Sequence, residues 1–276
     1  MKRLLLRIAA VLAAAAIALL AWIYVTLPDV RVLARENPKT TAWMEMRAEE
    51  ARLRHASAGR PRRVRHEQRW VPYERISPHL RRAVLLAEDP TFWRHEGIDL
   101  EQIREAVEIN IEEGRAVRGA STITQQLAKN LYLSPSRNPI RKLRELLIAR
   151  RLEAALTKQR IFEIYLNMIE WGDGVFGCEA ASRAYFGKAC ATLDYEEAAL
   201  LAGAIINPRE HSPAKPTRRL LRRQQIILRK MQYKPAPPPV EPANQSPIIV
   251  PVPMPFPSPP LPGNTTPVNG TPSSPS

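Results

Sequence analysis

A run of uncharged, mostly apolar residues from Ile8 to Leu27 constrains this chain more than any other feature of its sequence. About 20 such residues in a helix cross the ~30 Å hydrocarbon layer of a bilayer. Three cations, Lys2, Arg3 and Arg7, precede the run, and cations of this kind stay in the cytoplasm. A cleaved signal peptide is the alternative, but its apolar region is typically about 7 to 15 residues and ends in small side chains, whereas residues 22–25 are bulky. The run therefore predicts a retained single-pass anchor in the cytoplasmic (inner) membrane, with the rest of the chain on its outer, periplasmic side.

The far end of the chain has a different composition. Residues 235–276 hold most of the 27 prolines and a single charged side chain, Glu241. Prolines interrupt helices and strands and favour extended conformations, so these residues predict a disordered tail without catalytic content. Residues 30–69 are rich in Arg, Glu and Ala and predict a helical stalk. The expected organisation is an anchor at 1–29, the stalk at 30–69, a globular domain at 70–233 and the tail at 234–276.

The formal net charge of +14 narrows the classes of partner. The charge is carried mostly by Arg, whose forked side chain suits phosphate groups or an anionic membrane surface. Nucleic acid competes as a partner, but a chain beyond the membrane rarely meets it, and the sequence has no zinc-finger or basic-zipper spacing. Cys178 and Cys190 show no metal-binding spacing and are either a disulfide or two buried thiols.

Apolar residues of the central region recur with the period of an α-helix, and no stretch of four or more residues alternates convincingly as a strand would. Ser77 and Pro78 predict the N-cap and first position of a helix, which Pro90 ends just after residues 88–89. Further helical periods cover residues 100–113, 122–131, 141–156, 159–167, 179–186, 195–206 and 218–231. The domain is therefore expected to be mainly α.

Glu88 is the first candidate for chemistry. It ends an apolar helix in the stretch AEDPTFWRHEG. Partial burial there disfavours the charged carboxylate, raises its pKa and suits it to accept a proton. An exposed glutamate at a helix end is the alternative interpretation. His95, in the same stretch, is expected to hold the loop rather than to take part in chemistry.

A second candidate region is the stretch GASTITQQLAKN, residues 119–130. With a helical period its apolar residues share one side and its uncharged polar residues the other, whereas solvated helix surfaces usually carry Glu, Lys and Arg. The polar residues are Ser121, Thr122, Gln125, Gln126, Lys129 and Asn130. A solvated helix face is again the alternative.

Cations gather in and after the loop that follows this stretch. Together with Lys129 they are Arg137, Arg141 and Lys142, with Glu145 among them. Prolines in the loop allow the cations to converge, and converging Lys and Arg suit a diphosphate whose charge grows as it leaves. Glu145 must then be ionised and paired, or must compete for these cations. The alternative interpretation is a solvated basic surface.

Four ordered blocks in this region are similar to a known family. AEDPTFWRHEG, GASTITQQLAKNLYL, RKLRE and KQRIFEIYLNMIEWGDGVFGCEAASRAYFGK resemble the signature blocks of the peptidoglycan glycosyltransferases of glycosyltransferase family 51. The resemblance extends over about residues 70–231 and is closest to the monofunctional members, because the chain has no room for a penicillin-binding domain. It implies a lysozyme-like helical fold with a small apolar subdomain that lies in the membrane surface.

The resemblance also implies roles for individual residues. Glu88 resembles the base that deprotonates the 4-hydroxyl of the acceptor lipid II, so that this oxygen attacks the anomeric carbon of the lipid-linked donor with inversion and expels undecaprenyl diphosphate. Lys129 and Arg137 resemble the cations that hold the diphosphate, and Glu145 resembles the second functional carboxylate. The remaining residues of the predicted substrate-binding set are Ser121, Thr122, Gln125, Gln126, Asn130, Arg141 and Lys142.

Two other classes of function remain open at this point. A lytic glycosidase of similar helical fold would use Glu88 but would leave the cations without a role. A non-enzymatic, membrane-tethered basic module would explain the charge but not the uncharged polar residues. The expected partners are lipid II, the lipid-linked glycan chain, the membrane and other cell-wall synthesis proteins, but not nucleic acid. No metal ligands are predicted, and a requirement for a divalent cation, Mg or Mn, stays open.

Overall fold

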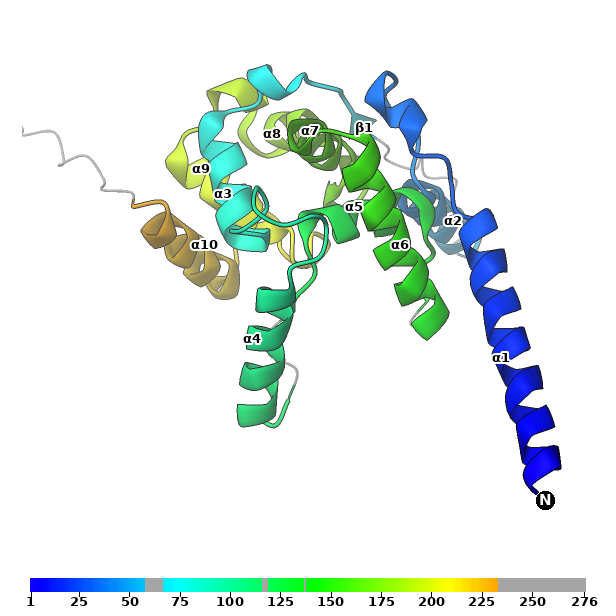
Figure 1. Ribbon diagram of the computed structural model, residues 1–276. Coiled ribbons are helices and arrows are strands. Elements are labelled where there is room, and N and C mark those ends of the chain that lie inside the picture. Colours follow the sequence, from blue (N-terminus) through cyan, green and yellow to red (C-terminus); the bar gives the residue numbers. More distant parts are fainter. Residues whose placement is uncertain (58–66, 116–118, 137, 233–276) are drawn as a thin grey trace, which may run out of the picture. The chain divides into compact units, whose positions relative to one another are not determined.

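The computed structural model describes residues 1–57, 67–115, 119–136 and 138–232 (Figure 1). In these ranges the protein is mainly helical, as the sequence predicts. The strands are β1 (Glu67–Gln68), β2 (Glu170–Gly172) and β3 (Val175–Phe176), which form one small sheet in the order β1-β3-β2. The predicted tail lies outside the described residues. Met1–Lys234 form one compact unit, so the predicted boundaries at residues 29 and 69 stay predictions.

Ten α-helices are described. They are α1 (Lys2–Val25), α2 (Ala42–Ser57), α3 (Pro78–Glu88), α4 (Leu100–Glu112), α5 (Ile123–Tyr132), α6 (Pro139–Ala155), α7 (Lys158–Met168), α8 (Cys178–Phe186), α9 (Tyr195–Ala204) and α10 (Arg218–Lys230). Three short 3-10 helices are η1 (Arg31–Ala34), η2 (Tyr73–Arg75) and η3 (Cys190–Thr192). Every predicted helical period ends within two residues of a helix boundary, which confirms the helix pattern.

The helix starts follow from local chemistry. Ser77, Thr122, Thr157 and Thr217 each accept a hydrogen bond from a backbone N–H in the first turn of the helix that follows. Such N-caps satisfy one of the amide groups that a helix leaves without an internal partner. The caps of α3 and α5 fix where these two helices begin, and both helices carry candidate site residues.

The centre of the core is α7. From Ile161 onward nearly all its side chains are buried, and Trp171 in β2 is fully buried beside it. A helix whose side chains are buried on nearly every side lies inside a domain. Around it, α5 packs against α6 and α7, while α3 and α10 both pack against α9. This arrangement brings the end of α3, the length of α5 and one face of α10 together.

The predicted stalk is helical in part, but it also belongs to the core. Val30, Leu33 and Met44 are buried in the same apolar cluster as the central helices, and α2 packs against α5. The Trp43 indole donates to Glu170 at 3.0 Å, and Arg47 donates to the same carboxylate oxygen. A free spacer would not bury these side chains. Residues 30–57 therefore pack as part of the body that carries the candidate site.

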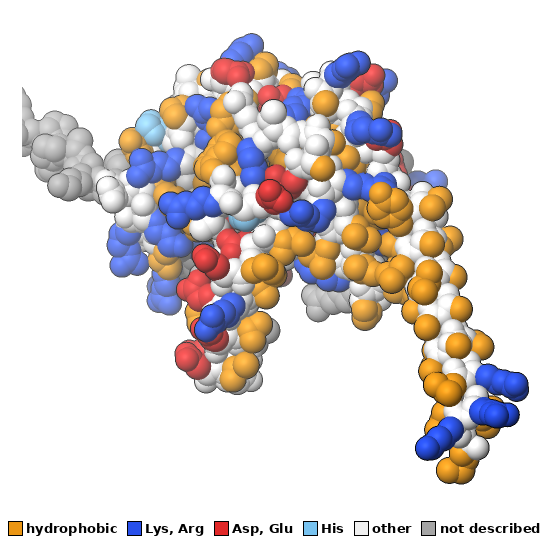
Figure 2. All heavy atoms as spheres, viewed as in Figure 1, with side chains coloured by type: hydrophobic (Ala, Val, Ile, Leu, Met, Phe, Trp, Pro, Cys, Tyr) orange, Lys and Arg blue, Asp and Glu red, His pale blue; other side chains and the backbone are white. Residues whose placement is uncertain are grey.

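Helix α1 is long and apolar enough to span a membrane. Figure 2 shows hydrophobic side chains along α1 and Lys and Arg side chains towards its start. Its C-terminal end is held by α6. Arg151 donates to the carbonyls of Tyr24 and Leu27, and Arg144 donates to the Thr26 hydroxyl and carbonyl. These contacts satisfy carbonyls that the end of a helix leaves open.

Candidate functional site

Glu88 is the last residue of α3, and its side chain is almost buried, with 12% exposed. Its Oε2 accepts a hydrogen bond from the Gln126 amide of α5 at 3.0 Å. Its Oε1 accepts one from the Arg223 guanidinium of α10 at 3.1 Å. Burial raises the pKa of Glu88, while Gln126, Arg223 and, at longer range, Lys129 oppose that rise. Glu88, Gln126 and Arg223 are called the base centre below.

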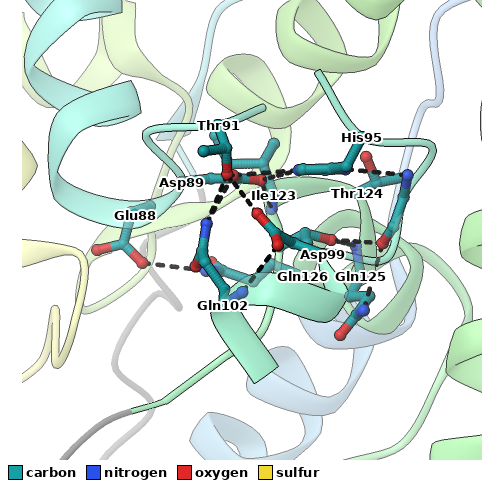
Figure 3. Close-up of polar contacts among 12 residues, drawn as sticks. Glu88, Asp89, Thr91, His95, Asp99, Gln102, Ile123, Thr124, Gln125 and Gln126 are labelled. Carbon is teal, nitrogen blue, oxygen red and sulfur yellow. Dashed lines mark hydrogen bonds and ion pairs between the residues drawn. The ribbon is translucent and has the colours of Figure 1, made fainter. Parts of the chain in front are cut away.

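The neighbouring Asp89 holds the base centre in place from within the protein (Figure 3). It is fully buried and accepts hydrogen bonds from the Ile123 backbone N–H at 3.0 Å and from His95 Nε2 at 3.0 Å. Since the Gly97 backbone N–H donates to His95 Nδ1, the proton of the neutral ring lies on Nε2. His95 therefore lies as the sequence suggested, as a link that holds the loop after α3.

Gly97 continues this link to α5. Its backbone is left-handed, with φ of 84°, and a Cβ there would lie 3.0 Å from Glu153 Cγ. Glycine adopts this conformation without the steric cost that other residues meet. Its carbonyl accepts hydrogen bonds from the Thr122 hydroxyl at 2.7 Å and the Gln125 amide at 3.2 Å. The loop is thereby tied to the start of α5.

The polar residues predicted for α5 differ in their burial. Thr122 and Gln125 are buried with internal partners, and Asn130 donates to the Gln126 carbonyl. These side chains have partners inside the protein and shape the loop and the helix, and their predicted contact with substrate stays a prediction. Ser121 is exposed and Gln126 is half-buried, and their predicted contact with substrate stays a prediction as well.

Gln126 is oriented by a second buried group. The Tyr165 hydroxyl of α7 donates to Gln126 Oε1 at 2.8 Å, which leaves the Gln126 NH₂ group to face Glu88. Burial, together with the nearby Glu88 and Asp89 charges, raises the pKa of Tyr165 well above its usual value. Tyr165 therefore stays a neutral donor at physiological pH and fixes which end of the amide faces the carboxylate.

Lys129, Arg141, Lys142 and Glu145 form a second group, called the cation cluster below. Glu145 is buried and accepts from Arg141 at 2.6 Å and from Lys142 at 2.5 Å, so it is paired, which is one of the two alternatives that the sequence left open. Lys142 also donates to Gln125. Burial lowers the pKa of Lys129, and the Glu145 charge opposes this. Arg137, a predicted member, lies outside the described residues.

Asp89, His95 and Asp99 form a grouping that the sequence analysis did not predict. Their ligand atoms lie within 4.8 Å of one another, a spacing that could hold a metal ion. However, the Ile123 N–H, the Gln102 amide and N–H, and the Thr91 hydroxyl all donate to these carboxylates. These hydrogen bonds explain why the three side chains lie together, because they connect the loop after α3 to the starts of α4 and α5.

Sequence reasoning missed three residues at the site. Arg223 and Tyr165 lie far along the chain from Glu88, and no local pattern connects them to it. Trp43 of α2 places its ring 5.8 Å from Lys129 Nζ, within the range of a cation–π contact. The sequence signal nearest to Arg223 is the run of Arg in residues 218–230, and that run does not point to a carboxylate inside the protein.

Comparisons with known proteins identify the family of this chain. Curated relatives include proteins named "Biosynthetic peptidoglycan transglycosylase" from Aromatoleum aromaticum, Laribacter hongkongensis and Chromobacterium violaceum. The first is 51% identical over 63% of this chain and 74% of its own length. The second is 49% identical over 71% of this chain and 84% of its own length. The third is 44% identical over 84% of this chain and 98% of its own length. A family profile described as Transglycosylase matches residues 56–232, so this chain belongs to the transglycosylase family.

Proposed function

We propose that this protein is a peptidoglycan glycosyltransferase that polymerises lipid II into glycan strands. The observation that carries the proposal is the placement of two different groups along α5. A desolvated carboxylate contacts Gln126, and a set of cations begins at Lys129, one helical turn further on. A reaction that takes a proton from a hydroxyl and releases a diphosphate needs both groups at once.

In the proposed reaction, Glu88 accepts the proton of the 4-hydroxyl of the acceptor lipid II. The oxygen forms a bond to the anomeric carbon of the lipid-linked donor, and the bond from that carbon to the diphosphate oxygen breaks. Attack from the opposite face inverts the anomeric centre and gives a β-1,4 linkage. The proton stays on Glu88, and the electron pair leaves with undecaprenyl diphosphate.

The cation cluster is proposed to receive the leaving diphosphate. Lys129 is mostly buried, which strengthens its interaction with charge that develops on the phosphate oxygens. Arg141 and Lys142 are held by Glu145, so the cluster is arranged before substrate binds. We assign Arg137 to the same role from the sequence motif alone. Glu145 is proposed to act by arranging cations, not by transferring protons.

A divalent cation such as Mg or Mn prefers oxygen ligands. Glu145 is the carboxylate of the cation cluster, and each of its oxygens is already bound by a side-chain nitrogen. The described residues of the cluster therefore do not fit a protein-held metal. If polymerisation depends on Mg or Mn, the ion is expected to arrive with the diphosphate, and a titration with EDTA and added metal would measure that dependence.

Incubation of the purified full-length protein with lipid II tests the function directly. The products are scored for new polymer and, in a separate reaction, for shortening of glycan made beforehand. Polymer formed by active but not by boiled protein supports the proposal. Shortening of glycan without synthesis would favour the lytic glycosidase, and no reaction in either assay would favour the non-enzymatic basic module.

We also propose that α1 anchors the protein in the inner membrane, with the catalytic body on the periplasmic side. The cations before the apolar run and the envelope location of peptidoglycan support this orientation. A reporter that works only outside the cytoplasm, fused after Met231, should be active. Activity of a cytoplasmic reporter at the same position would reverse the orientation. Other cell-wall synthesis proteins are proposed as partners and could be sought by cross-linking.

A further inference from the structure

The ion pair between Arg223 and Glu88 joins the last described helix to the end of α3. The two residues are 135 positions apart in the sequence, and their side chains are 30% and 12% exposed. Contacts between such distant residues exist only because the fold brings α10 against α3 and α9. Arg223 thus contacts the base through tertiary structure, and the predicted set of site residues does not include it.

The position of Arg223 is set by close packing. Thr217 caps α10, and Gln224 donates to the Glu196 carbonyl at the start of α9. At Gly203 the two helices approach so closely that a Cβ would lie 3.1 Å from Leu220 and 3.7 Å from Arg223 Cγ. The backbone that carries the guanidinium is therefore fixed from both sides.

Several titratable or charged groups face Glu88, and they differ in kind. Lys129 of α5 acts on it at longer range, Tyr165 of α7 acts through Gln126, and Asp89 is the next residue on α3. Among the described residues, Arg223 is the cation that forms a direct ion pair with Glu88. Burial alone would favour the protonated form of Glu88, which cannot accept a proton. The ion pair with Arg223 lowers the pKa of Glu88 and so favours the ionised carboxylate.

The guanidinium has a second notable feature. Its Nε is buried and has no hydrogen-bond partner among the described residues. A buried donor without a partner costs stability, and such groups call for a functional or structural explanation. The side chain therefore satisfies the carboxylate while leaving one of its own donors open. That pattern fits a group placed for Glu88 and not for its own hydrogen bonding.

We propose that Arg223 is a positioning residue for glycosyl transfer, which holds Glu88 as an oriented carboxylate ready to accept the proton of the acceptor hydroxyl. This inference rests on the proposed function of Glu88 as the base. Arg223 fixes one carboxylate oxygen from α10 while Gln126 fixes the other from α5. The carboxylate of Glu88, which α3 carries, is thus held between side chains of two other helices, α5 and α10.

The test uses the full-length protein and compares Arg223→Gln with Arg223→Lys and the neighbouring control Arg222→Gln. Arg222 is exposed on the same helix, and no ion pair is described for it. Turnover and the Michaelis constant are measured against pH. We expect Arg223→Gln to lower turnover roughly tenfold to a hundredfold at neutral pH, the range for a lost charge-assisted contact, with a smaller change in the Michaelis constant. The acid limb of the pH profile of turnover should move to higher pH in Arg223→Gln. Arg223→Lys should keep part of the wild-type rate.

An equal loss at every pH, with the acid limb unmoved, would overturn the proposal and leave Arg223 a structural residue. Carboxyl ¹³C NMR of Glu88, assigned with Glu88→Gln, gives a second measurement that does not need activity. Its titration should move to higher pH in Arg223→Gln. If the Glu88 titration moves to higher pH in Arg223→Gln as expected but the wild-type protein never polymerises lipid II, the proposed function is refuted while the placement of Arg223 stands. If Arg223→Gln does not fold, the Glu88 titration is compared between Arg223→Lys and the wild type, and it should move in the same direction by a smaller amount.

Discussion

The base centre and the cation cluster both touch α5, yet they handle charge in different ways. At the base centre, one buried carboxylate is opposed by one direct cation and one amide. In the cation cluster, two described cations share Glu145, with Lys129 nearby and Lys142 partly exposed. At the base centre no second carboxylate can replace Glu88, whereas in the cation cluster several cations share the proposed binding of the diphosphate. The two regions should therefore fail differently when single residues are changed.

The largest effect is expected at the base centre. Glu88→Gln keeps the size of the side chain and most of its hydrogen bonding but removes the proton acceptor. Turnover should fall by roughly 10² to 10⁴, the range for a lost general base, while donor binding changes little. Steady-state kinetics with lipid II would measure both, with circular dichroism as the control for folding. A rate near that of the wild type would end the assignment of Glu88.

A change in the cation cluster should cost less and should alter two kinetic constants. Lys129→Ala and Arg137→Ala each remove a charge-assisted contact worth ~1.5 to 3 kcal/mol, or roughly tenfold to a hundredfold. Because the contact acts on bound donor and on the leaving diphosphate, turnover should fall while the apparent Michaelis constant rises. The exposed Arg219→Ala on α10 is a matched loss of charge outside the cluster. If turnover and the Michaelis constant of the Lys129 and Arg137 variants match those of Arg219→Ala, the diphosphate-binding role of these two cations is assigned wrongly.

The pH dependence should separate the two regions in one experiment. Activity needs ionised Glu88, so the rate should fall as pH drops through its raised pKa, above the usual value of 4.5. Activity also needs protonated Lys129, so the rate should fall as pH rises through its lowered pKa, below 10.5. The bell should therefore be narrower than the usual values would give, with up to about a tenfold change per pH unit on each limb. Loss of the alkaline limb in Lys129→Ala would identify Lys129 as the group that must be protonated. An unchanged alkaline limb in this variant would contradict that assignment.

A smaller effect is expected where α2 meets the cation cluster. Trp43→Ala removes a cation–π contact to Lys129, worth ~0.5 to 1 kcal/mol at a partly exposed site, or about twofold to fivefold. The effect should fall mainly on the Michaelis constant for the donor. Trp43→Phe keeps a ring but loses the hydrogen bond to Glu170, so it separates the two contacts. A change confined to thermal stability would show that α2 supports the fold alone.

The smallest effect is expected from the tail. A protein that lacks residues 235–276 should keep turnover within a few-fold of the full chain, because a stretch with one charge and many prolines is poorly suited to pack against a site. Lipid II polymerisation by the two proteins would be compared at equal concentration. Loss of most activity with helical content intact would give the tail a role that its composition does not suggest.

The sequence predicted the helices well because they depend on local signals. The Ser77 cap, the following Pro78 and the stop at Pro90 all act within a few residues, and the structure has a helix between them. The polar side of α5 was harder to interpret. Thr122 and Gln125 have the right period for an exposed face, but the loop at Gly97 covers them. Only the tertiary fold places that loop there.

The partners of Glu88 show the same limit more strongly. Glu88 and Gln126 were both predicted as site residues, from two separate motifs. Arg223 and Tyr165 could not be predicted, since their contacts depend on how α10 and α7 pack and not on any repeat in the chain. The packing of residues 30–57 was also beyond reach, because their Arg- and Glu-rich composition hides the few apolar side chains that enter the core.

The buried Asp89 network and the Arg223 ion pair also bear on when, during folding, the candidate site is complete. Individual helices form from local contacts, but Asp89 must find the start of α5, 34 residues away, and Glu88 must find α10, 135 residues away. Contacts between residues far apart in sequence require much of the chain to be ordered first. A chain that has not yet docked α10 has the base residue without its cation. With Arg223 as the proposed positioning residue, full catalytic competence is expected only once α10 has docked, so a chain still emerging from synthesis has the motifs of the family before it has full activity.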